Sequence, residues 1–213
     1  MTNIIWKTDF LTTLALEDEL IPNGYSLKIE LIPNTKHVEE QAIALERLRV
    51  FCETIVSGSI LSSFENKNLE KLMETYVTNV MFLPDDPYDQ LFTIILHSKL
   101  SAILEQRCFI TNMSLSSTMG NLEYVFDSET FEYPDILTED ILPGKCAWWG
   151  RPDISTMDII IEKDDELSIH DQEFNWEHIG LTWDGDKEKE GKIIDVKKFR
   201  PKIVEGKPND TDD

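Results

Sequence analysis

Alternation of apolar and polar positions predicts strands near the start of the chain. Between Gly24 and Pro33, Tyr25, Leu27, Ile29 and Leu31 alternate with polar residues, so one face of this segment is apolar. The segment from Ile4 to Leu16 is a candidate first strand, and residues 18–24 have the composition of a turn.

Apolar residues spaced three and four apart predict helices further along. One amphipathic helix is expected from Val38 to Val56, with Arg47 off its apolar stripe, and Ser57-Gly58 should end it. A shorter helix is expected over 68–76. A third should run from about Tyr88 to Gln106, because aspartates and Pro87 supply start signals.

Three further strands complete the pattern. They are expected over 77–83, 108–116 and 122–126, with a turn at Gly120-Asn121 joining the last two as a hairpin. Strands alternating with helices, followed by a hairpin, favour a mixed sheet with helices on one face. The predicted fold class is therefore α+β, a two-layer sandwich.

The regular pattern fades after residue 126. We expect an α+β core over residues 1–126, an aromatic-containing acidic extension over 127–183 packed on or beside it, and a charged tail over 184–213. The C-terminal part is expected to be partly irregular, with one short candidate strand over 157–161.

Charge changes the picture most. The chain of 213 residues has 41 acidic and 20 basic side chains, a formal net charge of -21. Residues 127–213 hold -13 of this excess and residues 1–126 hold -8. A strong negative field repels nucleic acid and anionic membranes and favours basic partners.

Composition also bears on location. The longest apolar runs fall short of the roughly 18–20 residues needed to cross a bilayer, and the N-terminus has no secretory-signal pattern. Cys52, Cys108 and Cys146 are odd in number and widely spaced, as reduced thiols are. We therefore predict a cytoplasmic protein that neither binds membrane nor carries a cofactor.

Tryptophans in the irregular region are the strongest candidates for a binding role. Tryptophan is enriched at interaction hot spots, which makes four residues candidate partner-binding anchors: Trp148, Trp149, Trp176 and Trp183. The alternative is that these segments fold back and the indoles cover the core. The acidic run Asp164, Asp165 and Glu166 is a candidate for steering a partner, although a solvated turn is the default explanation of such a run.

Catalytic and metal motifs are weak. His170 and His178, with carboxylates between them, match no standard metal-site spacing. Asp85, Asp86 and Asp89 are explained by the preference for negative charge at a helix N-terminus. His97 lies on an apolar helix stripe and is expected in the core rather than in a catalytic role.

Two functions from different classes follow. The first is a non-enzymatic acidic interaction protein that binds a basic surface of another protein, in its sharper version as an inhibitor or nucleic-acid mimic. Such a composition suits a phage-encoded or accessory protein. The alternative is a small metal-dependent hydrolase that uses clustered carboxylates and histidine.

Overall fold

A six-stranded mixed sheet packed under two helices forms the body of the molecule. The computed structural model describes residues 3–17, 19–68, 71, 79–127, 147–156 and 175–183. The strands are β1 (Ile4–Leu16), β2 (Glu19–Pro33), β3 (Ile60–Ser63), β4 (Val80–Leu83), β5 (Cys108–Ser117) and β6 (Glu123–Asp127). The helices are α1 (Val38–Val50), which continues as the π-helix η1 (Phe51–Val56), α3 (Asp89–Leu104) and the short 3₁₀ turn η2 (Trp148–Gly150).

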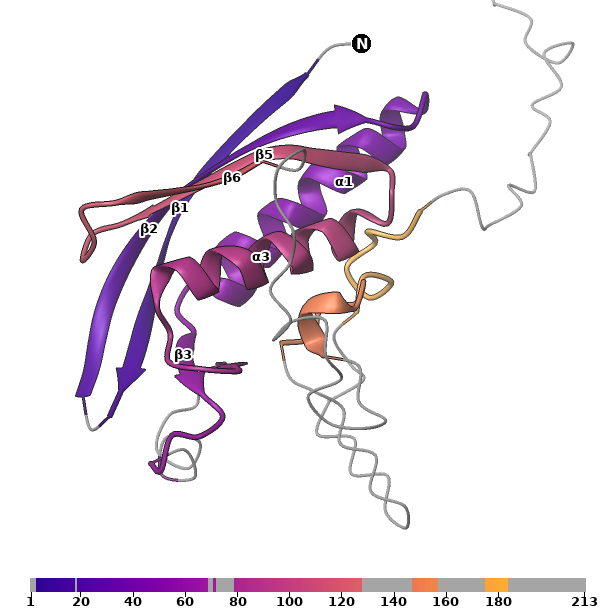
Figure 1. Ribbon diagram of the computed structural model, residues 1–213. Helices are drawn as coiled ribbons and strands as arrows, with labels where there is room; N and C mark the ends of the chain where they lie inside the picture. Colours follow the sequence, from indigo (N-terminus) through magenta and orange to yellow (C-terminus); the bar gives the residue numbers. More distant parts are fainter. Residues whose placement is uncertain are drawn as a thin grey trace, which may run out of the picture.

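The sheet order is β4-β3-β1-β2-β5-β6. Neighbouring strands β1, β2, β5 and β6 are antiparallel, whereas β3 pairs parallel with both β1 and β4. Figure 1 shows α1 and α3 side by side on one face of this sheet. The predicted α+β class, with a mixed sheet and helices on one face, is confirmed.

The alternation in β1 and β2 explains where the core lies. Phe10 and Leu14 of β1 and Tyr25, Leu27 and Ile29 of β2 point inward and are buried. Together with the apolar sides of α1, η1 and α3 they form one hydrophobic cluster. Burial of this apolar surface is the main favourable contribution to folding.

The prediction of a turn over residues 18–24 was wrong. β2 begins at Glu19 and pairs with β1 from Glu19 to Leu31, with Thr13 opposite Pro22. The amide of Thr13 donates to the Ser59 carbonyl, so the backbone groups of Thr13 point away from β2. β1 therefore needs no hydrogen bond from Pro22, which has no N–H to donate. Turn-type residues are thus tolerated inside a strand.

Two other predictions were incomplete. The four-residue strand β3 was missed, because a run as short as Ile60–Ser63 carries little periodicity. The helix predicted from 88 to 106 begins at Asp89 and ends at Leu104, where Glu105 and Gln106 take positive φ. Except for Asn68 and Lys71, the helix predicted over 68–76 lies outside the described residues, as does the strand over 157–161.

Within the described ranges, no helix is long and apolar enough to cross a membrane.

Candidate functional site

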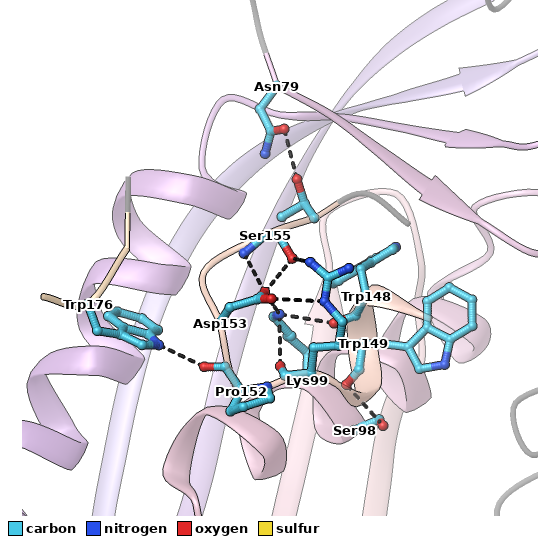
Figure 2. Close-up of polar contacts among 11 residues, drawn as sticks. Asn79, Ser98, Lys99, Trp148, Trp149, Pro152, Asp153, Ser155 and Trp176 are labelled. Carbon is cyan, nitrogen blue, oxygen red and sulfur yellow. Dashed lines mark hydrogen bonds and ion pairs between the residues drawn. The ribbon is translucent and has the colours of Figure 1, made fainter. Parts of the chain in front are cut away.

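Two C-terminal segments, 147–156 and 175–183, pack against the helices and bring the sequence-predicted tryptophans into one region. Their apolar residues belong to the same hydrophobic cluster as the sheet and helices. The indole Nε1 of Trp176 donates to the Pro152 carbonyl at 2.7 Å, so the two segments also contact each other. Figure 2 shows this contact and the polar cluster beside it.

Lys99 of α3 is at the centre of that cluster. Its side chain is fully buried, and its ammonium donates to the carbonyls of Trp148 and Arg151, each at 3.0 Å. A third, longer contact of 3.5 Å reaches the Asp153 carboxylate. A buried ammonium needs such acceptors, because an unpaired charge is costly to desolvate. Lys99 therefore fixes segment 147–156 onto α3 (Figure 2).

Asp153 holds the turn that surrounds Lys99. It accepts hydrogen bonds from Arg151 at 2.9 Å and from the backbone and hydroxyl of Ser155. Burial alone would raise the pKa of Asp153. The hydrogen bonds from Ser155 and Arg151, with the charges of Lys99 and Arg151, outweigh burial and lower this pKa to about 2. The carboxylate is therefore ionised at neutral pH.

Arg47 of α1 fixes the second segment. Its guanidinium carbon lies 3.9 Å from the ring centroid of Trp183 and 4.9 Å from that of Trp176. Its Nε donates to the Leu181 carbonyl at 2.8 Å, and Nη1 donates to Glu105 at 2.7 Å. Burial lowers the pKa of Arg47, and the hydrogen bond and charge of Glu105 oppose that shift. Buried cation–π contacts of this kind are worth about 2 kcal/mol.

The prediction that Arg47 lies off the apolar stripe was wrong, since only 2% of the residue is exposed. Sequence reasoning also passed over Lys99, which lies in an otherwise apolar helix, Asp89–Leu104. A single lysine in such a helix was the available signal that it has buried partners. Arg47 had no comparable signal, because its helix, Val38–Val50, carries several other charged residues.

All four candidate tryptophans are buried within the chain's own core. Trp148 donates from Nε1 to the Phe82 carbonyl at 2.8 Å and packs edge-on against Trp149. This is the fold-back arrangement that the sequence left open. A role for these indoles as partner anchors stays a prediction, and it would require the segments to detach. Asp164, Asp165 and Glu166 lie outside the described residues.

A second polar group lies at the N-terminus of α3. Asp89 accepts hydrogen bonds from the Tyr25 hydroxyl at 3.0 Å and the Ser117 hydroxyl at 2.6 Å. Burial, followed by the nearby charge of Asp89, raises the pKa of Tyr25. A phenol with a raised pKa stays protonated, so Tyr25 does not act as a base, and the network joins β2, β5 and α3.

The remaining titratable candidates are also internal. His97 is buried and stacks on Phe126, as the helix pattern predicted, and burial lowers its pKa to about 4. Cys52 and Cys108 are buried thiols whose pKa is raised by burial, which makes them poor nucleophiles.

The metal-ligand candidates do not come together in the described part of the chain. Within it, no group of three or more His, Cys, Asp or Glu side chains is placed to hold a metal ion. His178 is exposed, and His170 lies outside the described residues.

Comparison with known proteins adds little to this site. No protein-family model and no curated protein sequence matches the chain. Among solved structures, two catalytic-residue mutants of Plasmodium vivax 6-pyruvoyltetrahydropterin synthase match at 10% identity with a TM-score of 0.38. The match covers 59% of this chain and 96% of that protein. A likeness this distant carries no conclusion about function.

Proposed function

We propose that this protein is a non-enzymatic acidic interaction protein that binds a basic surface of another protein. One observation carries the proposal. The described residues include 17 acidic and 10 basic side chains. Three of these cations, Arg47, Lys99 and Arg151, are buried, whereas none of the described carboxylates is.

The fold therefore makes the surface more acidic than composition alone suggests. Arg47 and Lys99 bind carbonyls of the C-terminal segments, and Arg151 binds Asp153 and Ser155, so these cations are turned inward. The described carboxylates stay at least partly exposed to solvent. A field of this sign accelerates encounter with a basic surface and disfavours direct contact with nucleic acid.

The sharper version of the proposal is an inhibitor that mimics nucleic acid and occupies the binding cleft of another protein. The charge of residues 157–174 supports this nucleic-acid mimic, because these residues hold seven acidic side chains and one lysine. Asp164, Asp165 and Glu166 are the proposed steering residues within this run. The reduced, buried thiols Cys52 and Cys108 fit the cytoplasmic location that we propose.

The test is kinetic. The full chain would be immobilised, cross-linked to proteins in a lysate at low ionic strength, and the captured protein purified and identified. Binding of the purified pair would then be measured from low to physiological ionic strength. We expect a basic protein whose association rate falls about tenfold or more as salt rises, because long-range steering is screened first.

Charge variants make the test specific. Replacing Asp164, Asp165 and Glu166 with Asn, Asn and Gln should slow association and leave dissociation nearly unchanged. Neutralising Glu39, Glu53 and Glu65, which are exposed in the core part of the chain, removes the same number of charges and is the matched control at sites not proposed to steer. Association that is indifferent to salt, or a captured partner that proves to be nucleic acid, would overturn the proposal.

A further inference from the structure

One edge of β1 is only partly used by the sheet. β1 runs for 13 residues, but its parallel neighbour β3 pairs with it only from Thr13 to Ala15. Figure 1 shows β3 beside the far end of β1, away from the labelled N-terminus. The stretch Asn3–Asp9 therefore has β2 on one side and none of the described strands on the other. We call it the free edge.

Two hydrogen bonds of β1 just beyond the free edge establish which backbone groups point away from β2. The Leu11 carbonyl accepts from Gly58 N–H at 2.7 Å, and Thr13 N–H donates to the Ser59 carbonyl at 2.9 Å. Odd-numbered residues here thus direct their polar groups away from β2. Because the β1–β2 register is unbroken, Ile5, Lys7 and Asp9 do the same.

The outward backbone N–H and C=O groups of the free edge have no partner among the described residues. No described backbone hydrogen bond reaches Ile5, Lys7 or Asp9 from the outer side. Their side chains are exposed as well, with 58% of Ile5 accessible to solvent. Outward N–H and C=O groups on an uncovered edge are a template for another strand.

We propose that the free edge pairs antiparallel with the free edge of a second copy of this chain, about a two-fold axis at Trp6. Asn3 then lies opposite Asp9 of the second copy, and Ile5 opposite Lys7. The two-fold axis repeats both pairs, which gives four hydrogen-bonded residue pairs, each exchanging two backbone bonds.

Charge and space favour this register over the next one toward Leu11. The next register along places Lys7 opposite its own copy and brings Asn3 against Leu11, whose carbonyl is already bound to Gly58. In the proposed register no like charges are opposed, the lysine stem packs on Ile5, and Asn3 can donate to Asp9. The half-buried Trp6 rings meet across the axis on the inner face, as an aromatic cross-strand pair.

This self-association goes beyond the proposed function and has the opposite dependence on salt. Two chains of net charge -21 repel each other, so added salt should strengthen the dimer. The same salt should weaken binding to a basic partner. Failure of one proposal is therefore distinguishable from failure of the other.

Sedimentation velocity of the full chain, from low micromolar to near-millimolar concentration, is the first measurement. We expect a closed monomer–dimer equilibrium that shifts toward dimer with added salt. Lys7→Pro removes an outward N–H that makes no bond to the described residues, and it should lower the association constant about tenfold or more. Lys7→Ala keeps the N–H and should change it less than about threefold. Equal urea midpoints for the two variants would show that folding is intact.

Residue-level hydrogen exchange gives a second readout. On dimerisation the amides of Ile5, Lys7 and Asp9 should exchange more slowly, whereas those of Trp6 and Thr8, already bonded to β2, should not change. A chain that stays monomeric throughout, a dimer unaffected by Lys7→Pro, open-ended polymers, or protection without the odd–even pattern would overturn the inference.

Discussion

Replacing the buried Lys99 with Met is the sharpest test of how the C-terminal segments are held. Methionine fills a similar volume without charge or donors. The carbonyls of Trp148 and Arg151 would then lose the ammonium that contacts each at 3.0 Å. Each buried acceptor left without a partner costs about 1–3 kcal/mol, so the two give about 2–6 kcal/mol.

Two other effects adjust that range. The contact of Lys99 with Asp153 is long, at 3.5 Å, and that carboxylate is 45% exposed, so its loss adds little. Removing a buried charge also relieves its desolvation, which offsets part of the loss. We expect a net destabilisation of about 2–4 kcal/mol. For a chain of this size, this lowers the melting temperature by roughly 5–15 °C.

Urea unfolding followed by tryptophan fluorescence is the assay, because the four indoles of the C-terminal segments are buried. Lys28→Met is the matched control, since Lys28 forms a partly exposed ion pair with Glu30, and its loss should stay within about 0.5 kcal/mol. A Lys99→Met variant as stable as the unmodified chain would refute the assignment of Lys99 as the residue that fixes segment 147–156.

Four further predictions concern pH, order and metal. The pKa of His97 is lowered to about 4, so the unfolded chain binds this proton first and stability should fall as pH drops from about 6.5 to 4; urea midpoints should show His97→Phe to be less sensitive in that window. The pKa of Asp153 is lowered to about 2, so its contribution is complete above about pH 4 and lost toward pH 2; Asp153→Asn should flatten that acid limb of the same titration. Limited proteolysis should remove the charge-rich tail beyond residue 184 first, and early cuts within 38–56 would contradict the core assignment. Stoichiometric Zn²⁺, Mn²⁺ or Mg²⁺ should barely change the melting temperature; a large saturable rise, lost when His170 and His178 are replaced with Ala, would favour the hydrolase alternative.

The sequence alone was sufficient for the elements with long periodic patterns. The alternation in Gly24–Pro33 and the apolar spacing in Val38–Val56 predicted a strand and a helix, and both are present. These patterns are local, because a strand repeats every two residues and a helix every 3.6. The α+β class followed from the order of such elements, and the acidic balance was readable directly from composition.

Tertiary structure decided what depends on contacts between distant segments. β3 exists because Ile60–Ser63 pairs with strands on both sides. Pro22 fits inside β2 because the opposite residue, Thr13, makes no backbone hydrogen bond to it. The partners of Arg47 and Lys99 were also decided by the fold. Arg47 donates to the Leu181 carbonyl, 134 residues away in sequence, and Lys99 donates to the Trp148 carbonyl, 49 residues away.

The tryptophans illustrate the limit most clearly. Sequence reasoning could state that Trp148 and Trp176 either bind a partner or cover the core, but both outcomes bury the same indole. Only the fold supplies the acceptors, the carbonyls of Phe82 and Pro152, that place the two rings inside the chain. A hydrogen-bond partner for a buried side chain is a property of three-dimensional proximity, and periodicity along one chain does not encode it.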